Sequence, residues 1–502
     1  MKKLASLLIF GLGLAAASCD SYLDINEDPN SPATSNLNTS IVLPAAEMNI
    51  VGSYGDFARI YAGYYAQYYS QTFGTSNYLD LSQFTMSATR SSSFYTQLNQ
   101  RGLKNLETVR EMAKDGEEWG TYLAATTLRA FTYQVLVDCY GEVPYTEAFQ
   151  SGISSPAYDD GATIYNGILA ELDEALNLAS PSDPVATNFL YQGETAANWI
   201  KFANALKLKI LSRESGVANV DSQIGAIISA GNLPTKDVAY AGIWGTEPGS
   251  MSPFYAEEFS TAWGSTQINV IANIALIGTM LQKDEEGAVT YEDGRLAAFF
   301  EKNGSGAYTG GVSGTNFSTS ATMKSTYWCR PVASYDMPVY YITLSEIEFF
   351  IAEYYARQGN AAQAEAHYNA AIEASFATAG VDGAAAAIAK FPYDQNNYKK
   401  SIGISKWIAL SGVNTFEGWC EMRRLDYPAF GTVKGSDIYN VANDTYKPEL
   451  YKPGTLYTPI QVDGKVGDNH LLERWIYPES SSARNGNSPE FPGYTVPVFW
   501  GK

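Results

Sequence analysis

The chain has 502 residues, with 33 Lys or Arg against 53 Asp or Glu, so its formal net charge at pH 7 is −20. A surface this acidic disfavours binding to nucleic acid and adsorption on anionic lipid. Hydrophobic residues make up 45% of the chain, which is ample for a large core in one large domain or a few.

The first nineteen residues have the pattern of a secretion signal. Lys2 and Lys3 form a basic start, the apolar stretch 4–17 is too short to span a bilayer, and small residues lead to Cys19. A short polar stretch then precedes folded-looking sequence. The pattern predicts a lipoprotein signal peptide over residues 1–18, with cleavage before Cys19 and lipid on its sulfur. The alternative is an ordinary signal peptide with an incidental cysteine.

Helical periodicity dominates the first half of the mature chain. Three helical pairs are predicted, namely 46–73 with 93–114, 119–138 with 162–179, and 195–214 with 219–230. The first helix contains five tyrosines at positions 61, 64, 65, 68 and 69. On a helix they would form one stripe about 140° wide, which favours packing against a neighbouring helix over a platform for sugar.

Residues 344–376 match the tetratricopeptide pattern of about 34 residues. The matching small and aromatic positions are Ala352, Tyr355, Gly359, Ala364, Tyr368 and Ala371. The pattern predicts two antiparallel helices joined by a turn at Gly359–Asn360. Because single helix pairs cannot bury their faces, several must stack. We therefore predict an all-α fold, a tetratricopeptide-like helical repeat scaffold with repeats at about 40–230 and 343–378.

Long irregular loop insertions interrupt the predicted helices. Residues 74–92 and 232–342 are rich in Gly, Ser, Asn and Thr with scattered aromatics, and residues 427–502 carry many Pro, Gly, Tyr and Asn. Little strand is expected. Because surface loops on a rigid scaffold commonly carry binding sites, we expect the ligand-binding part in the loop-rich regions at about 232–342 and 379–502.

Five sequence blocks resemble the SusD/RagB family of outer-membrane lipoproteins of Bacteroidetes, and in particular its SusD-like branch. They are VDCYGEVPYTEAF (137–149), NWIKFANALKLKILSR (198–213), EDGRLAAFF (292–300), MPVYYITLSEIEFFIAEYYARQGN (337–360) and FEGWCEMRRLDYP (416–428). These blocks keep the family's order and span nearly the whole mature chain. The resemblance implies that residues 19–502 form a single SusD-like domain, lipid-anchored and surface-exposed at the outer membrane.

The resemblance also implies a function. The protein is expected to capture oligosaccharide and pass it to a SusC-like TonB-dependent transporter, without being an enzyme. Capture of peptide, as in RagB-like relatives, is the alternative. A glycan-cleaving enzyme and a pure assembly adaptor are further hypotheses. Production of reducing sugar by the purified protein would favour the enzyme. Binding to the transporter without any ligand would favour the adaptor.

Two of these five blocks also indicate a role from their residues alone. Gly141 and Pro144 end a helix, which predicts a structural role for the segment that begins at Asp138. Glu417 and Glu421 lie on one helical face, and Arg424 allows an intrahelical ion pair with Glu421 worth about 0.2–0.5 kcal/mol. An arginine neighbour disfavours the raised pKa that a catalytic acid needs, so this pair is not expected to be catalytic.

No nucleophile, dinucleotide or metal-binding motif occurs, so no cofactor and no metal is predicted. The acidic residues between 284 and 293 lack the spacing of a calcium loop and indicate a solvated loop. His367 and His470 are expected to be ordinary. Besides Cys19, the cysteines are Cys139, Cys329 and Cys420, for which buried free thiols are favoured over a Cys329–Cys420 disulfide.

Carbohydrate recognition needs flat aromatic faces and polar groups for hydroxyls. Seven loop residues fit these needs, namely Asn77, Tyr78, Asp80, Trp244, Trp263, Tyr308 and Trp328. We predict that they contribute to one shallow aromatic patch that binds the ligand. The alternative for each aromatic is a hydrophobic plug that anchors a long loop.

Overall fold

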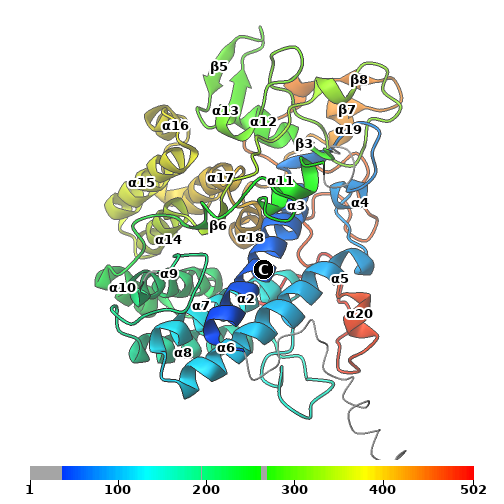
Figure 1. Cartoon of the computed structure of the whole chain (residues 1–502). Coiled ribbons are helices and arrows are strands. Elements are labelled where there is room, and N and C mark those ends of the chain that lie inside the picture. The colour runs from blue at the N-terminus through cyan, green and yellow to red at the C-terminus, as the bar shows by residue number, and fades with distance from the viewer. Residues whose placement is uncertain (1–36, 194, 262–267, 502) are drawn as a thin grey trace, which may run out of the picture.

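The computed structural model describes residues 37–193, 195–261 and 268–501. The predicted signal peptide and Cys19 therefore lie outside the described residues. Helices dominate, and the few strands are short. Long helices form the lower and middle parts of the molecule as seen in Figure 1, whereas most strands and irregular loops gather in the upper part. The predicted all-α repeat scaffold with long loop insertions is confirmed.

Two helical rods form the N-terminal part, and each contains a π-helical stretch in its middle. The first comprises α2 (Thr39–Ser53), the π-helical η2 (Tyr54–Ala58) and α3 (Arg59–Tyr65). The second comprises α5 (Ala88–Thr96), the π-helical η3 (Gln97–Leu103) and α6 (Lys104–Asp115). The rods contact each other through α2, η3 and α6, which confirms the first predicted pair with altered bounds.

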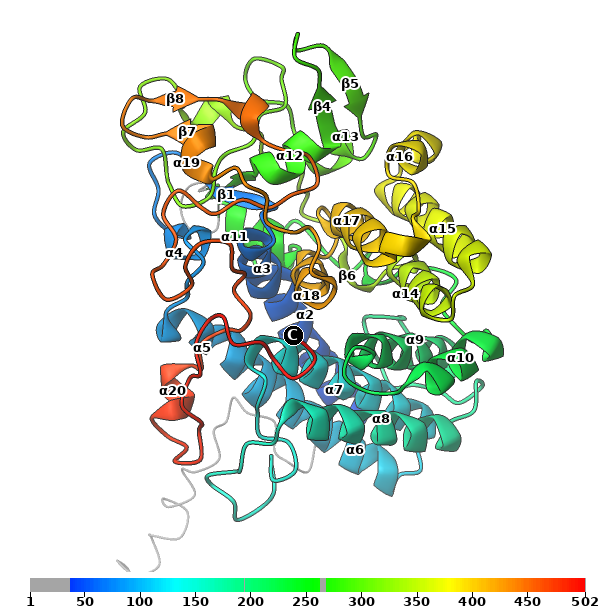
Figure 2. The same cartoon turned by 180° about the vertical axis from the view of Figure 1, so that it is seen from behind.

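The other predicted helix pairs are also present. They are α7 (Trp119–Tyr140) with α8 (Gly161–Leu178), α9 (Ala196–Glu214) with α10 (Asp221–Ala230), and α14 (Leu344–Arg357) with α15 (Ala361–Ala379). Gly359 has a φ of +70°, so the predicted turn falls where a left-handed backbone is needed. Figure 2 shows these pairs stacked side by side from behind. The tetratricopeptide-like prediction is confirmed.

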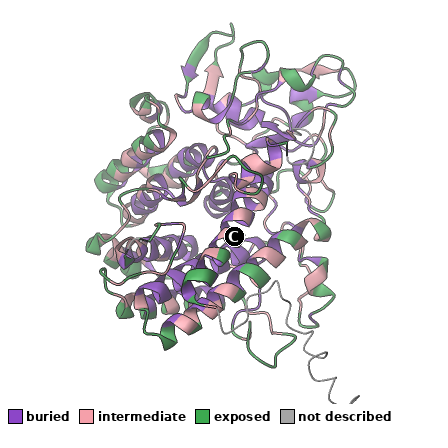
Figure 3. Cartoon of the chain, viewed as in Figure 1, coloured by how far each residue is buried: buried purple, intermediate pink, exposed green. Residues whose placement is uncertain are grey.

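Two core helices lie in a segment that we expected to be loop-rich. After α16 (Ala384–Lys390) come α17 (Tyr398–Leu410) and α18 (Thr415–Leu425), which pack on each other and on α14 and α3. Figure 3 shows both of them largely buried, whereas α15 and α16 also present exposed residues on their outer sides. The repeat scaffold therefore continues past residue 379, and the irregular C-terminal part begins after Leu425.

The five clustered tyrosines are buried, each with at most 4% of its surface exposed. The prediction that they serve packing is confirmed. The predicted helix through residue 73 is wrong, because α3 ends at Tyr65 and Gln67 adopts a φ of +53°. The Gln67 amide donates to the Tyr457 carbonyl at 2.6 Å and accepts from the Tyr457 N–H at 3.2 Å, so a distant loop holds this turn.

The strands form four antiparallel two-stranded ladders. They are β1 (Tyr69–Gln71) with β3 (Val270–Ala272), β2 (Val238–Tyr240) with β6 (Val339–Ile342), β4 (Leu281–Lys283) with β5 (Val289–Glu292), and β7 (Tyr439–Asn440) with β8 (Thr445–Tyr446). The remaining short helices are α4 (Leu79–Ser82), α11 (Pro253–Glu258), α12 (Ile274–Met280), α13 (Leu296–Phe299), η4 (Ser325–Tyr327), η5 (Gln395–Asn397), α19 (Gly435–Ile438), η6 (Pro448–Leu450) and α20 (Glu479–Ser482). The first ladder ties the long insertion 232–342 to the segment that follows α3, and the second pairs the two ends of that insertion with each other.

The cysteines that the structure describes are buried free thiols, so the favoured prediction is confirmed and the Cys329–Cys420 disulfide is absent. Among the described residues, no helix combines the length and apolarity that a membrane span requires.

Glu47, on α2, has a fully buried carboxylate. It accepts hydrogen bonds from the Phe189 N–H at 2.7 Å, the Leu190 N–H at 3.3 Å and the Tyr240 hydroxyl at 3.1 Å. Burial raises the pKa of Glu47 to about 7, although these hydrogen bonds oppose the rise. The folded protein therefore binds this proton more tightly than the unfolded chain does.

We expect Glu47→Gln to flatten the pH dependence of stability. Because the folded pKa is raised, the stability that protonation provides is fully present below about pH 4.5 and is lost as pH rises through about 7. The variant should remove about 2 kcal/mol of the wild-type change in unfolding free energy between about pH 5 and pH 8. Urea unfolding at both pH values measures it. Glu286→Gln, on an exposed turn, is the control. An unchanged pH dependence in Glu47→Gln would contradict the assignment.

Candidate ligand-binding groove

An open groove lies where the two N-terminal rods meet α11 and the loop after β2. It has a volume of about 460 Å³, within the usual range of small-molecule sites. Its lining residues are Met48, Asn49, Gly52, Ser53, Asp56, Phe57, Gln97, Trp244, Gly249, Met251, Pro253, Ala256 and Glu257. The lining thus combines two aromatic rings, two amides and two carboxylates.

Both π-helical stretches contribute to the groove, because Asp56 and Phe57 lie in η2 and Gln97 lies in η3. Such stretches occur frequently at functional sites. Each contains a glycine at a close contact. A Cβ at Gly55 would lie 2.8 Å from Cγ2 of Val339, and a Cβ at Gly102 would lie 2.8 Å from Cγ1 of Ile50. These glycines allow the rods to approach β6 and each other closely.

Two acceptor atoms in the groove have no protein donor among the described residues. They are Oδ1 of Asp56 and Oε1 of Gln97, and both atoms are shielded from solvent. A buried acceptor without a partner costs free energy, typically about 1–3 kcal/mol. Their position in one groove indicates a site for a ligand that donates hydrogen bonds.

Trp244 is the sequence-predicted residue that lines this groove. It is half-buried, and its indole N–H donates to the Tyr240 carbonyl at 3.2 Å, which fixes the ring at the start of the loop after β2. Phe57, from η2, is the second half-buried aromatic of the lining. Aromatic rings held in this way provide flat faces for an apolar side of a ligand.

Asn77, Tyr78 and Asp80 lie next to the groove rather than in its lining. Arg90 forms a two-pronged ion pair with Asp80 at 2.8 and 2.9 Å and also donates to the Asn77 carbonyl. Tyr78 has only 4% of its surface exposed, and its ring lies near the ring of Tyr61 and the guanidinium group of Arg90. Burial, followed by the charges of Glu258, Asp56 and Glu257, raises the pKa of Tyr78.

Tyr308 and Trp328 lie in another environment. Trp328 is 2% exposed and packs against Phe317, Tyr327 and Tyr446, with ring centroids 4.5, 4.8 and 5.6 Å away. Tyr308 is half-buried, with the Lys302 ammonium 5.2 Å from its ring centroid. Trp263 lies outside the described residues. The structure therefore brings Trp244 and the Tyr78 region together but does not join them to Tyr308 and Trp328.

The sequence reasoning missed Asp56, Phe57, Gln97 and Glu257. Their signal was weak, because Asp56 and Phe57 precede the tyrosine cluster by only a few residues and were grouped with the scaffold.

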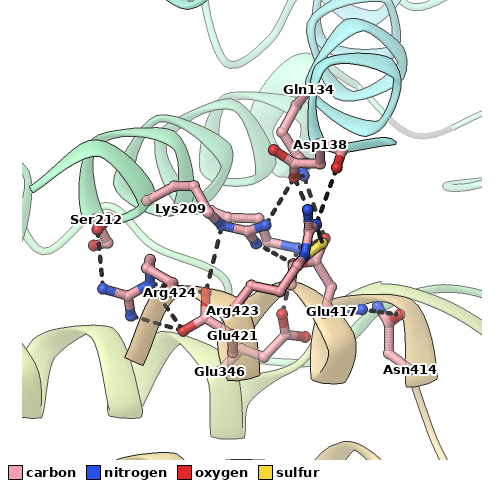
Figure 4. A network of polar contacts seen from close by, with 12 residues as sticks. Gln134, Asp138, Lys209, Ser212, Glu346, Asn414, Glu417, Glu421, Arg423 and Arg424 are labelled. Carbon is pink, nitrogen blue, oxygen red and sulfur yellow. Dashed lines mark hydrogen bonds and ion pairs between the residues drawn. The ribbon is translucent and has the colours of Figure 1, made fainter. Parts of the chain in front are cut away.

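A second polar cluster lies deep in the scaffold and connects five helices (Figure 4). Its charged members are Asp138 on α7, Lys209 and Arg213 on α9, Glu346 and Glu353 on α14, Lys406 on α17, and Glu417, Glu421, Arg423 and Arg424 on α18. Lys209 contacts Glu417 at 3.0 Å and Glu346 at 3.3 Å, while Arg213 contacts Asp138 at 2.7 Å and also pairs with Glu417. All of these side chains are buried.

The cluster is structural rather than catalytic. Burial alone would raise the pKa of Glu421, but Arg424, Lys406 and Arg213 outweigh it and hold that pKa well below its usual range. The predicted Glu421–Arg424 pair is present at 2.7 Å, but Arg424 also binds Glu353, at 2.5 Å. The contribution of about 0.2–0.5 kcal/mol that we expected for the Glu421–Arg424 pair holds for exposed helical pairs and does not apply to this buried one. The structural role predicted for Asp138 is confirmed.

No metal centre is evident in the part of the chain that the structure describes, where no group of three or more His, Cys, Asp or Glu could hold an ion. His367 contacts Glu348 at 2.6 Å and stacks on Tyr355 at the surface of the repeat pair. This pair adds to the packing between α14 and α15, where the Phe349 and Tyr368 rings also meet.

Comparisons with solved structures give the same architecture. A SusD homolog from Bacteroides uniformis is 21% identical with a TM-score of 0.71, over 92% of this chain and 99% of that chain. A chitin-binding protein is 19% identical with a TM-score of 0.69, over 92% and 100%. A chitin-binding SusD homolog from Flavobacterium johnsoniae is 19% identical with a TM-score of 0.65, over 92% and 96%. A comparison with curated proteins finds no match.

The stacked helix pairs and the groove outside them define a tetratricopeptide-like repeat protein with long surface insertions. A family model matches residues 29–450 and is described as "SusD-like_2: Starch-binding associating with outer membrane". Because this match covers well over half of the sequence, the chain belongs to the SusD-like family. At the level of the family, that description is one of glycan binding and association with the outer membrane.

Proposed function

We propose that this protein is a surface lipoprotein of the outer membrane that captures oligosaccharide and passes it to a SusC-like TonB-dependent transporter. The observation that carries the proposal is the groove at Trp244, which presents aromatic faces beside unpartnered acceptors. Membership of a family described as starch-binding, and the printed names of two chitin-binding relatives, support oligosaccharide as the ligand class.

The ligand contacts follow from the same groove. Trp244 and Phe57 cover the C–H face of a sugar ring, while Asn49, Gln97 and Asp56 bind its hydroxyl groups. The Tyr78 region with Asp80 forms the adjoining wall.

Binding is tested by a soluble-glycan array and by isothermal titration calorimetry with residues 20–502. We expect saturable binding of at least one starch-type or chitin-type oligosaccharide, with no release of reducing sugar. Binding of peptides alone would replace this function by the peptide-uptake alternative, and turnover of glycan would make the protein an enzyme.

The lipid anchor is tested separately. We expect Cys19→Ala to shift the full-length protein from the membrane fraction of the expressing cells to a soluble fraction, because cleavage and lipidation both require the thiol. Cys329→Ala, at a buried thiol far along the sequence, is the control. Retention of Cys19→Ala in the membrane fraction after a salt wash would contradict the anchor. Co-purification of the wild-type protein with a SusC-like transporter tests the partner.

A further inference from the structure

The groove is acidic on one side. Asp56 and Glu257 line it, and Glu258 follows on the same short helix. No Lys or Arg belongs to its lining among the described residues. A cation bound in the groove would favour the ionised form of these carboxyl groups, and the chain as a whole, with its net charge of −20, attracts cations.

The neighbouring cations are engaged elsewhere. Arg90 is held by Asp80, as described above. Arg59 donates to the carbonyls of Val413 and Gly412 at 3.1 and 2.9 Å, and its guanidinium lies 4.7 Å from the centroid of the Phe254 ring. Neither arginine is therefore positioned to neutralise Asp56.

Asp56 differs from its acidic neighbour Glu258 in its partners. Glu258 accepts from the Asn269 N–H at 2.7 Å and from the Asn269 amide at 3.3 Å. Oδ1 of Asp56 has no donor in the described structure. Burial, and then the charges of Glu257 and Glu258, raise the pKa of Asp56 well above its usual range. A cationic donor at this point would relieve both the unpartnered acceptor and the repulsion.

We propose that the groove prefers an oligosaccharide of 2-amino sugars with free, protonated amino groups, one of which binds the Asp56 carboxylate beside Glu257. This proposal rests on the proposed function and names its ligand class. The amino group of such a sugar is fixed directly to the ring. A ring that stacks on Trp244 or Phe57 therefore carries its ammonium group to the acidic side without the entropy cost of ordering a long side chain.

The test compares glucosamine hexamer with N-acetylglucosamine hexamer by calorimetry at about pH 6 and 0.15 M salt. Wild-type protein is expected to bind the free amine form at least about tenfold more tightly. Asp56→Asn and Glu257→Gln should each reduce this preference severalfold or more. Glu286→Gln, which removes an exposed carboxylate outside the groove, should leave the preference unchanged. Circular dichroism confirms folding.

The outcomes separate the two proposals. Equal or weaker binding of the free amine form, with the acetylated hexamer still bound, would overturn the ligand class and leave the proposed function standing. A preference that survives in both groove variants would also overturn it, since nonspecific attraction to an acidic protein would then be the cause. Binding of a lysine-rich peptide and of no glycan would overturn both proposals.

Discussion

Arg213→Met is expected to lower the free energy of unfolding by about 3–5 kcal/mol, or to prevent folding. Arg213 is fully buried and contacts Asp138 at 2.7 Å, Glu417, and Glu421 at 3.4 Å. Methionine fills a similar volume but leaves carboxylates in the core with fewer compensating charges. Chemical denaturation followed by circular dichroism measures the change.

The matched control is Lys434→Met, which removes a cation from the exposed pair with Asp468. Its unfolding midpoint is expected to match that of the wild type, because exposed ion pairs contribute little. Equal midpoints for both variants and the wild type would mean that the buried cluster is not needed for stability.

The buried cluster also bears on the groove. Its helix α18 packs on α3, and the adjoining Asn414 accepts from the Tyr54 hydroxyl at 3.0 Å. Arg59, at the start of α3, donates to carbonyls just before α18. Because Tyr54 begins η2, the stretch that carries Asp56 and Phe57 is braced by the same core that the charges hold together. The scaffold thereby fixes one wall of the groove.

Trp244→Ala is expected to weaken oligosaccharide binding about tenfold or more, which corresponds to about 1.4 kcal/mol. The substitution removes the half-buried indole of the groove and leaves its acceptors in place. Calorimetry with the ligand identified on the glycan array measures the loss. Phe149→Ala, which removes an exposed aromatic from a different loop, is the control and should leave the affinity unchanged.

Tyr308→Ala distinguishes the two loop environments. A loss of affinity in Tyr308→Ala together with unchanged affinity in Trp244→Ala would move the ligand site to the loops around Trp328. A loss confined to Trp244→Ala supports the groove. Either conclusion about the ligand site requires that the unfolding midpoints of both variants match that of the wild type.

Local patterns predicted the repeat scaffold well. The spacing of small and aromatic residues from Ala352 to Ala371 indicated α14 and α15. Thr343 and Glu346 form a capping box, so α14 begins at Leu344, as expected. The tyrosine cluster was correctly read as packing. Its helix was predicted too long because the turn at Gln67 depends on Tyr457, which is distant in sequence.

The groove could be predicted only in part. Trp244 was identified as an aromatic in a loop, but the residues that face it come from α2, η2, η3 and α11. Nothing local in the sequence indicates which helical stretches become π-helical or which acceptors stay unpartnered. The burial of Trp328 fits the alternative that the sequence left open, a hydrophobic plug that anchors a long loop. The buried cluster could not be predicted from local sequence either, because its partners Asp138, Arg213 and Glu417 lie on three different helices.

A crystal structure with the highest-affinity oligosaccharide tests the central claim most directly. We predict that a sugar ring lies against Trp244 and Phe57, with a polar group of the ligand within hydrogen-bond distance of Asp56 or Gln97. A ligand seated instead against Tyr308 and the loops around Tyr446, with the Trp244 groove filled only by water, would contradict the account.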